Sequence, residues 1–568
     1  MSLPAIATTE VLIAGAGPTG LVLACDLARR GIACRVVERE SRSFPGSRGS
    51  GLQPRTLEVF DDLGVIDAIR AAGGPVQRLQ SWDGTTRVAE WDTAERSEPS
   101  PHVPYGEMWM LPQWRTVEIL QARLEELGGS VEFDCELTGF AQDADGVTAR
   151  LRGPDGTGSA VRAGYLVAAD GGRSTVRKAL GVGFPVTDIL TDPTLIADVL
   201  IDGFDRAHWH VWPTAPGGRV ALRPLEGADL FQLLAHFGGA GPDFTPDATP
   251  EAVQQLLVER TGHEDVRVHE VRWSSVLRIK AGAADRFRVG RVLLAGDAAH
   301  IHSPTGGQGL NTSIQDAYNL GWKLGAALRG ASDALLDTYE AERRPVAQQV
   351  LALTTQVFEQ DRVDTDRGFS RRGGETLQLG LGYRESPLTR ECREGLAGDA
   401  LRAGDRAPDA PCGPIRLFDL FRGPHATLLA FGGTDAPASE RYQRVRVGRP
   451  GEPADVIDVD GHAHQAYGDR GLFLVRPDGY VAFATEDPAD LASYEVHWQG
   501  PARGPSPHPH PRRADVTTRT AASVRAEPLD QAPDDDDRGE GEEGPHPPVE
   551  GAVAGAAVVA AGVVVVAM

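Results

Sequence analysis

The pattern of hydrophobic and polar positions changes several times along the chain. Residues 9–185 alternate strand-like apolar runs with helix-like periodicity, which predicts an α/β fold. Residues 186–275 carry short alternating runs such as VALRPLEGADLFQLLAHF, which predict an antiparallel sheet. Residues 276–355 return to strand, loop and long helix, and 360–395 resemble a linker with helical parts. The predicted domains are a discontinuous first domain (1–185 and 276–395), an inserted sheet domain (186–275) and a C-terminal domain (400–498).

The end of the chain has a different composition. Residues 499–550 are rich in Pro, Arg, His, Asp and Glu and contain DDDDRGEGEEG, a composition that cannot bury a core. Residues 551–568 are uncharged and consist almost wholly of Ala, Val and Gly. They are just long enough for a membrane span, but Ala and Gly contribute little to insertion and no basic or aromatic flank is present. We expect a disordered low-complexity tail over 499–568; a membrane anchor and a reading-frame artefact remain as alternatives.

The charge and the cysteine content of the chain indicate its cellular compartment and the kinds of partner it can bind. The 568 residues carry a net charge of −23, which argues against nucleic acids and anionic membranes as general partners, since both need basic patches. Its five cysteines are scattered without a CxxC pair, which suits a reducing cytosol and offers no disulfide framework or zinc site. The N-terminus has no basic segment before its first strand-like run, so we expect no signal peptide and a cytoplasmic protein.

A dinucleotide-binding fingerprint lies near the N-terminus, in VLIAGAGPTGLVLACDLARRGIACRVVERE. Gly15 permits a tight turn, Gly17 lets the backbone approach a pyrophosphate, and Gly20 lets the helix pack on the strand. The helix N-terminus attracts the phosphate charge. Glu38, at the end of the next strand, can accept hydrogen bonds from a ribose. The pattern predicts a bound dinucleotide, but NAD and FAD share it.

Two further strand-like runs end in polar turns. YLVAAD ends at Asp170 and Gly171, and RVLLAGD ends at Gly296 and Asp297. Because ligands bind at the carboxyl edge of doubly wound sheets, a carboxylate there can bind a ribose or ribityl hydroxyl. The HxH pair at residues 300 and 302 lacks spaced third and fourth ligands, so we expect no metal site.

The order of these motifs is highly specific. GxGxxG, then DG, then GDAAHxxxPxGGQGxN resembles the single-component FAD-dependent aromatic hydroxylases over about residues 9–355. The resemblance implies a Rossmann-like FAD-binding domain of the glutathione-reductase type with an inserted substrate domain. Residues 400–498 resemble the thioredoxin-like C-terminal domain of the phenol hydroxylase and polyketide hydroxylase branch. Without CxxC, that domain is expected to serve packing or dimerisation, and a homodimer is one expected partner state.

The resemblance carries over to individual positions of this sequence. Arg39 would lie near the adenine, Arg48 near the pyrophosphate and the nicotinamide nucleotide, and Gln113 would contact FAD. Asp170 would serve both FAD and NADPH, and Asp297 would bind the ribityl chain. The residues expected to line the isoalloxazine and the oxygen site are Pro304, Gly306, Gly307, Gly309, Leu310 and Asn311.

The implied chemistry belongs to the flavin, and the protein supplies position and shielding. NADPH or NADH reduces FAD, O2 adds to the reduced flavin, and a C4a-hydroperoxide transfers OH to an electron-rich ring. Since 153–158 does not fit a second fingerprint, the nicotinamide nucleotide is expected to dock transiently as electron donor.

The substrate, an aromatic small molecule, is expected between the flavin and the sheet of residues 186–275. His210 and His236 are candidate proton relays, and Trp212, Arg223 and Phe231 are candidate substrate contacts. Strand alternation separates Phe231, Leu233 and Ala235 from Gln232, Leu234 and His236, without deciding which face meets the cavity; core packing is the competing interpretation for each aromatic residue.

Several functions fit the sequence. The leading hypothesis is hydroxylation of an aromatic or polycyclic phenolic compound in the tailoring of a polyketide or antibiotic. Catabolism of a small phenol or arylpropionate and oxidative inactivation of an antibiotic are alternatives with the same chemistry. A flavin-binding module without turnover is an alternative of another class, which the intact GGQG run disfavours.

Overall fold

The computed structural model describes residues 6–92, 98–303, 307–363, 375–434 and 439–494, which belong to one compact unit of the chain. Two residues of the predicted oxygen site, Pro304 and Gly306, lie outside the described residues. So does the predicted tail over 499–568. No helix in the described part of the chain has both the length and the apolar character needed to cross a membrane.

The first sheet has a parallel centre. In the described residues its strands run in the order β17 (Arg288–Val289), β18 (Val292–Leu294), β11 (Gly158–Ala168), β1 (Ala7–Ala14), β2 (Cys34–Val37), β8 (Val131–Glu132). The pairs β18–β11, β11–β1 and β1–β2 are parallel. The antiparallel strands β10 (Val147–Arg152) and β9 (Glu136–Gln142) extend from β11. The parallel strands place their carboxyl ends at one edge, as in doubly wound folds.

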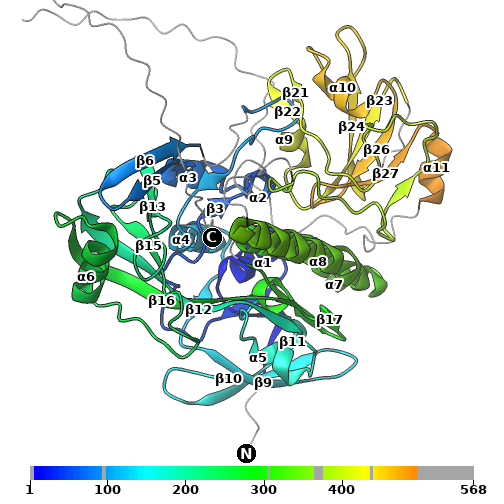
Figure 1. Ribbon diagram of the computed structural model, residues 1–568. Helices are drawn as coiled ribbons and strands as arrows, with labels where there is room; N and C mark the ends of the chain where they lie inside the picture. The colour runs from blue at the N-terminus through cyan, green and yellow to red at the C-terminus, as the bar shows by residue number, and fades with distance from the viewer. Residues whose placement is uncertain (1–5, 93–97, 304–306, 364–374, 435–438, 495–568) are drawn as a thin grey trace, which may run out of the picture. The chain divides into compact units, whose positions relative to one another are not determined.

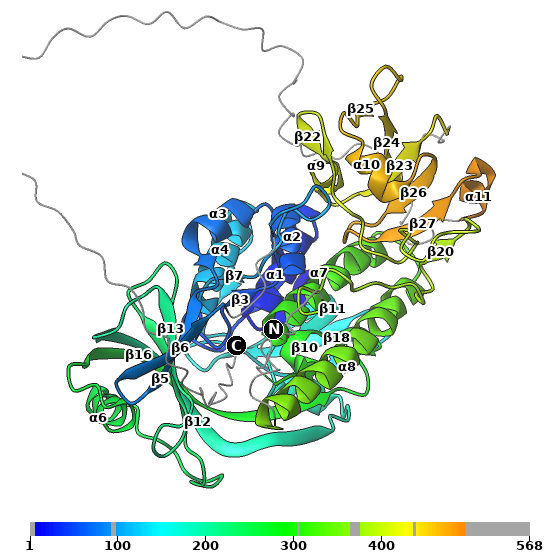
Figure 2. The ribbon, with the colours of Figure 1, turned by 45° about the horizontal axis from the view of Figure 1, so that its top comes forward.

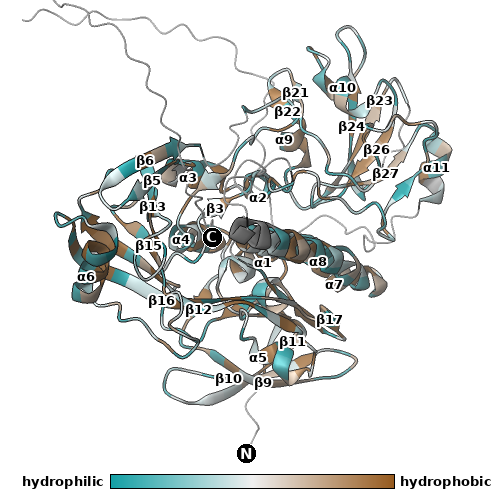
Figure 3. Ribbon diagram, viewed as in Figure 1, coloured by the Kyte–Doolittle hydropathy of each residue, from teal (hydrophilic) through white to brown (hydrophobic). Residues whose placement is uncertain are grey.

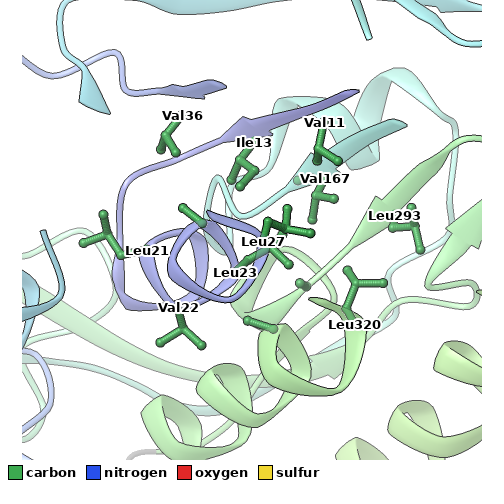
Figure 4. Close-up of a cluster of buried hydrophobic side chains, with 14 of the residues drawn as sticks. Val11, Ile13, Leu21, Val22, Leu23, Leu27, Val36, Val167, Leu293 and Leu320 are labelled. Carbon is green, nitrogen blue, oxygen red and sulfur yellow. The ribbon is translucent and has the colours of Figure 1, made fainter. Parts of the chain in front are cut away.

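The core of this sheet explains why its strands are continuous apolar runs. A parallel strand with both faces covered must be hydrophobic on both faces, and Val11, Leu12 and Ile13 are fully buried. Helix α1 (Pro18–Arg29) packs its apolar residues against β1, and Leu21 and Leu27 lie in this cluster (Figure 4). α1 also contacts α4 (Gln113–Glu126) and α7 (Gln308–Leu328).

The second sheet is almost wholly antiparallel and carries α6 (Pro250–Thr261) on one face (Figure 1). Its strands run in the order β19 (His300–Ile301), β16 (Arg267–Ala283), β12 (Val186–Asp202), β15 (Phe231–His236), β14 (Val220–Pro224), β13 (His208–Trp212), β5 (Arg78–Asp83), β6 (Thr86–Trp91). α6 carries both hydrophobic and hydrophilic residues (Figure 3), and it buries Val253 and Leu257. Strands β5, β6 and β19 come from segments that the sequence analysis assigned to the first domain, and residue 275 falls inside β16.

The C-terminal sheet runs in the order β20 (Arg390–Glu391), β27 (Val481–Thr485), β26 (Gly471–Val475), β23 (Ala426–Phe431), β24 (Tyr442–Gly448), β25 (Val456–Ile457). The pair β23–β24 is parallel, and β23–β26 and β26–β27 are antiparallel. Helices α9 (Leu417–Phe421), α10 (His462–Tyr467) and α11 (Pro488–Ser493) accompany it. The thioredoxin-like character of this unit stays a prediction.

Two long helices connect these parts. α7 and α8 (Ala334–Val363) lie side by side in both orientations of the ribbon (Figures 1 and 2). The smaller elements are α2 (Pro54–Leu63), α3 (Ile66–Ala72), α5 (Thr175–Ala179), the 3-10 turn Gly296–Ala298, and the short strands β3 (Gly51–Leu52), β4 (Gly74–Pro75), β7 (Trp109–Met110), β21 (Pro411–Cys412) and β22 (Ile415–Arg416). α7 begins beside the carboxyl edge of the first sheet, since Ser313 in its second turn lies 3.5 Å from Asp297. Its first turns therefore border the region where the site is expected.

Candidate functional site

Four strand ends meet at the carboxyl edge of the first sheet. Ala14 pairs with both Val37 and Ala168, and Ala168 pairs with Leu294, so the last residues of β1, β2, β11 and β18 are in register. The polar or flexible residues that follow these ends therefore gather at one place. They include Gly15, Glu38, Asp170 and Asp297.

Glycine is required in the first turn for two different reasons. Gly15 has φ +107°, and a Cβ there would lie 2.3 Å from the Ala169 carbonyl oxygen at the end of β11. A Cβ on Gly20 would lie 2.0 Å from the Gly15 carbonyl oxygen, so α1 could not approach β1. A Cβ on Gly17 would meet nothing within 4 Å. Since Gly17 is the N-cap of α1 and no side chain caps this helix, its first amides face open space, as an anion site requires.

Glu38 follows β2 and faces this turn. Its Oε2 accepts a hydrogen bond from the Ala16 amide at 3.0 Å, and its Oε1 accepts one from the Glu40 amide at 3.1 Å. Each carboxylate oxygen retains a lone pair that a ribose hydroxyl can use. Arg39 is exposed and pairs with Glu40 at 3.1 Å, so its guanidinium points away from the turn's interior.

Asp170 and Gly171 follow β11. One oxygen of Asp170 accepts hydrogen bonds from the Thr175 amide at 2.8 Å and the Val176 amide at 3.3 Å, which caps α5. Its other oxygen, Oδ1, is buried without a hydrogen-bond partner among the described residues. Gly171 has φ +76°, which turns the chain out of the strand toward α5. A buried carboxylate oxygen of this kind is suited to accept a bond from a ligand.

The charges of Asp297 and Arg48 interact with each other. Both side chains are open to solvent, yet the surrounding protein removes enough water to raise the pKa of Asp297 and to lower that of Arg48. The Arg48 charge opposes the rise in the pKa of Asp297, and Arg173 contributes to the fall in the pKa of Arg48. Gly296 before Asp297 has φ +61° and lies against Thr19 of α1. Two interacting opposite charges beside the strand ends can bind a polar ligand.

The segment that holds Arg48 is anchored on both sides. The Arg48 guanidinium lies 5.0 Å from the Phe44 ring centroid and 6.0 Å from that of Trp273 in β16. The Gly49 amide donates to Gln113 Oε1 at 3.2 Å, at the first residue of α4. A Cβ on Gly49 would lie 3.3 Å from Leu310 in the first turn of α7. The predicted residues Arg48, Gln113 and Leu310 are thus neighbours.

The N-terminus of α7 closes the site. Its N-cap is Gly307, with φ +64° and no side-chain cap, so the first amides of a 21-residue helix are free of side-chain caps. A Cβ on Gly309 would come no closer than 4.0 Å to His302, the nearest described residue, which leaves the outer side of Gly309 open. Asn311 was expected to line the flavin, but its side chain is engaged with the backbone of the protein. Its amide donates to the carbonyl oxygens of Gly51 at 2.8 Å and Gly307 at 2.7 Å, so it ties the helix start to β3.

A buried network joins the segment before α7 to α7 and α8, and its members Asp316 and Arg343 were not predicted from the sequence. His302 Nε2 lies 2.8 Å from His300 Nδ1, and His300 Nε2 lies 2.5 Å from Asp316 Oδ2. Arg343 of α8 donates to Asp316 Oδ1 at 2.7 Å and to the Tyr383 hydroxyl at 2.9 Å. Because a carboxylate only accepts, His300 donates to Asp316. A charged residue inside an apolar helix, in IQDAYNL, was the one sequence signal that could have indicated this network.

The histidines are thereby engaged with one another and with Asp316. Among the residues that the structure describes, no group of three His, Cys, Asp or Glu side chains is placed to hold a metal ion.

One face of the second sheet points toward this region. Arg223, fully buried, donates to Gln232 Oε1 at 2.5 Å, and the Gln232 amide donates to the Ser47 carbonyl oxygen, next to Arg48. Burial lowers the pKa of Arg223 to about 10. Trp209 lies on the same face, with its ring 4.9 Å from the Arg223 guanidinium. His236 shares the Gln232 face by strand alternation and bonds to Thr194 at 3.3 Å.

The opposite face holds three of the predicted substrate residues. Trp212 and Phe231 belong to the core cluster that includes Val253 and Leu257 of α6. His210 lies on the same side, with its ring 5.0 Å from that of Phe204, and its Nε2 bonds to the Asp205 carbonyl oxygen at 2.9 Å. The structure therefore assigns these three side chains to the core beneath α6 rather than to the site. The sequence could not decide this, because strand alternation separates the two faces without showing which of them another element will cover.

These observations fit FAD. Open space in front of α1 suits a pyrophosphate, Glu38 suits a ribose, and the Asp297 carboxylate at the next strand end suits a ribityl chain. The uncapped start of α7 suits the electron-rich end of a flavin ring. Each of these features lies at the same sheet edge or borders it.

Comparison with known proteins gives an independent result. Residues 8–354 match the family model "FAD binding domain", and residues 401–502 match "Aromatic-ring hydroxylase, C-terminal". A flavin-dependent monooxygenase of Mycobacteroides abscessus is 46% identical over 497 residues, covering 85% of this chain and 98% of that protein. A 12-dehydrotetracycline 5-monooxygenase/anhydrotetracycline 6-monooxygenase of Streptomyces rimosus is 36% identical, covering 87% and 99%. The ternary complex of aklavinone-11 hydroxylase with FAD and aklavinone superposes with TM-score 0.72 at 30% identity, covering 86% and 98%.

Proposed function

This chain belongs to the family of FAD-dependent aromatic-ring hydroxylases, and we propose that it hydroxylates an aromatic polyketide or a related polycyclic phenol with NAD(P)H as electron donor. The observation that carries the proposal is the convergence of Gly15, Glu38, Asp170 and Asp297 after four aligned strand ends. The substrate class is supported by relatives that act on anhydrotetracycline and aklavinone.

The redox chemistry would come from the cofactor. When bound, FAD supplies two-electron reduction by a nicotinamide nucleotide and activation of O2 for insertion of one oxygen atom into the ring. All other roles belong to side chains and backbone groups of this chain.

Binding of the nucleotide half would rest on the first turn. The uncapped amides of α1 would hold the pyrophosphate, with Gly17 allowing close approach. Glu38 would accept hydrogen bonds from the adenosine ribose while its own position is held by the Ala16 amide. Asp297 would accept hydrogen bonds from the ribityl chain, which would offset the desolvation that raises the pKa of its carboxyl group.

Orientation of the flavin ring would rest on α7. Gly307 and Gly309 leave room for the ring, and the free amides at the helix start carry positive potential that favours negative charge on a reduced flavin. Pro304 and Gly306 lie outside the described residues, and their role at the flavin face stays a prediction. Arg48 would meet the nicotinamide nucleotide, for which the sequence carries no second fingerprint.

The substrate would lie between α7 and the inner face of the second sheet. Arg223, Gln232 and Trp209 offer a buried cation, an amide and an aromatic ring on this face. His236 remains the proposed proton relay, and burial lowers its pKa, so it is a neutral acceptor at physiological pH. The sheet also excludes water from the flavin face, which an oxygen-activating site requires.

The test is a substrate panel with the purified full-length protein. Anhydrotetracycline, aklavinone, rifampicin and pentachlorophenol, on which relatives act, are compared for stimulation of NADPH and NADH oxidation. We expect a polycyclic compound to stimulate oxidation most and to gain one oxygen atom from isotope-labelled O2. Preferred turnover of rifampicin or of pentachlorophenol would favour antibiotic inactivation or catabolism instead. A protein that binds FAD but oxidises no nicotinamide nucleotide with any compound would be a non-catalytic flavin binder.

A further inference from the structure

The segment that follows α8 is more than a linker. Residues 375–386 lie against α2, α7 and α8 before the chain enters the C-terminal sheet. The Leu377 carbonyl oxygen accepts from the Arg55 amide at 3.4 Å, and the Tyr383 hydroxyl accepts from Arg343 at 2.9 Å. Ser386 donates to Glu342 at 2.6 Å. This segment is thus fastened to the helices that border the candidate flavin site.

Gln378 is its most heavily engaged side chain. It is 2% exposed, and its amide nitrogen donates to Gln308 Oε1 at 2.7 Å and to Thr312 Oγ1 at 3.3 Å. Its carbonyl oxygen accepts from the Gln315 amide at 2.5 Å. The three partners stand at positions i, i+4 and i+7 of α7, which form one stripe over its first two turns. A single side chain therefore holds the start of α7 from one side.

The backbone at Gln378 adds a second observation. Its φ is +61°, a left-handed conformation in which glycine is free and a residue with a Cβ is strained. In the described residues only Asp134, with φ +52°, is another non-glycine residue of this kind. Asp134 is exposed on the surface, whereas Gln378 is buried. A glycine at this position would remove the backbone strain, but it would also remove the three hydrogen bonds of the side chain. These hydrogen bonds therefore offset the strain.

The stripe that Gln378 holds belongs to the part of α7 that meets the site. Gln308 is the first residue of the helix, and its neighbour Gly307 is the N-cap. The second turn carries Ser313, whose hydroxyl lies 3.5 Å from Asp297 Oδ1. On another side, Asn311 accepts from the Gln53 amide at 2.8 Å. Asn311 and Gln378 thus fix the first turns of α7 between them.

We propose that Gln378 is a positioning residue for the flavin: through Gln308, Thr312 and Gln315 it sets where the positive end of α7 stands relative to the ring. This inference rests on the proposed function, which places the flavin ring at the start of α7. A displacement of the helix start changes the distance between its amides and the ring, and the dipole effect falls off within the first turn. The chain segment leading to the C-terminal sheet thereby contributes to the electronic environment of the cofactor.

The test compares Gln378→Gly and Gln378→Met with Asp134→Gly as the control for relief of left-handed strain. Apoprotein is titrated with FAD, and the visible circular dichroism and midpoint potential of the bound flavin are measured beside Tm. We expect both Gln378 variants to bind FAD about tenfold more weakly, as loss of a buried hydrogen-bond set implies. We also expect both to shift the flavin dichroism and potential, while Asp134→Gly leaves all three flavin readouts unchanged.

The possible results distinguish a failure of the positioning role of Gln378 from a failure of the proposed function. A Gln378→Gly protein whose FAD affinity, dichroism and potential equal those of the wild type, with only Tm altered, overturns the positioning role. If the Gln378 variants do not fold, Gln315→Met removes one of the three bonds and should shift the same readouts in the same direction. No shift in that variant also overturns the role. A wild-type protein that binds no FAD would instead refute the proposed function itself.

Discussion

At the scale of single residues, Asp297 offers the sharpest test of the cofactor site. We expect Asp297→Ala to raise the FAD dissociation constant about 10- to 100-fold, because it loses charge-assisted hydrogen bonds to the ribityl hydroxyls. Without FAD the variant should be no less stable than the wild type, since the raised pKa shows that the charge is costly where it stands. Fluorescence titration with FAD and thermal unfolding of apoprotein measure both effects.

His302→Ala is the matched control for that substitution. His302 is bonded to His300 at 2.8 Å, so its loss should change FAD affinity less than about threefold. Equal FAD affinity in wild type, Asp297→Ala and His302→Ala would show that the ribityl contact is placed wrongly.

Asp198 gives a prediction about pH. It is fully buried in β12, and burial raises its pKa to about 6 from 3.8, against the pull of the Arg223 charge. A raised pKa means that the folded state binds the proton more tightly than the unfolded state, so stability is lost as pH rises from about 4 through 6. Relative to Asp198→Asn, the wild type should lose about 3 kcal/mol of unfolding free energy between pH 4 and pH 7.

Urea unfolding of both proteins at several pH values measures this difference. A constant difference between wild type and Asp198→Asn across pH 4–7 would mean that Asp198 keeps its ordinary pKa in the folded protein. Asp188→Asn is a useful comparison, because Asp188 lies on the same strand but is exposed and pairs with Lys280 at 2.9 Å. Its pH dependence should be small.

At the scale of elements, the residues that the sequence predicted well are those at strand ends. Gly15, Glu38 and Asp297 each follow an apolar run whose length and composition mark a buried parallel strand. The local pattern predicts where such a strand stops, and parallel pairing then brings the ends to one edge. Their roles toward FAD stay predictions, while their gathering is a property of the sheet.

The second sheet shows which structural features the local sequence pattern does not predict. Alternation separated Gln232 from Phe231, but it could not tell which of the two faces meets the site. The position of α6 decided it, because Val253 and Leu257 cover the face with Phe231 and Trp212. Residues 78–91 joined this sheet through β5, which pairs with β13, a strand far later in the chain. Short-range periodicity carries no information about such a pairing.

At the scale of the whole molecule, a buried ionic cluster fastens the C-terminal unit to the helices α7 and α8. Arg476, in the turn after β26, forms hydrogen-bonded ion pairs with Glu342 at 2.7 and 2.9 Å and with Asp478 at 2.5 Å. Lys323 of α7 donates to the same Glu342 at 2.7 Å. These charged side chains are at most 1% exposed. Removing one partner of such a set leaves a buried charge without compensation.

We therefore expect Arg476→Met to lower the free energy of unfolding by about 3–5 kcal/mol. Arg384→Met is the matched control, since Arg384 makes an ion pair with Asp405 at 2.6 Å but is half exposed, and it should cost at most about 1 kcal/mol. Urea unfolding followed by tryptophan fluorescence compares the two. Equal losses in the two variants would show that the cluster does not hold the units together.

The sequence by itself determined the α/β class, the dinucleotide fingerprint and the family, and the comparisons confirm the family resemblance and the FAD-binding fold. These features depend on short-range patterns: apolar runs, glycines at fixed spacing and acids at strand ends. Only the tertiary structure decided that Trp212, Phe231 and His210 belong to the core, that Asn311 ties α7 to β3, that Gln378 binds the first turns of α7, and that Asp316 of α7 binds His300. Each of these depends on contacts between segments far apart in the chain, and no local pattern records which distant side chain will fill a given hydrogen bond.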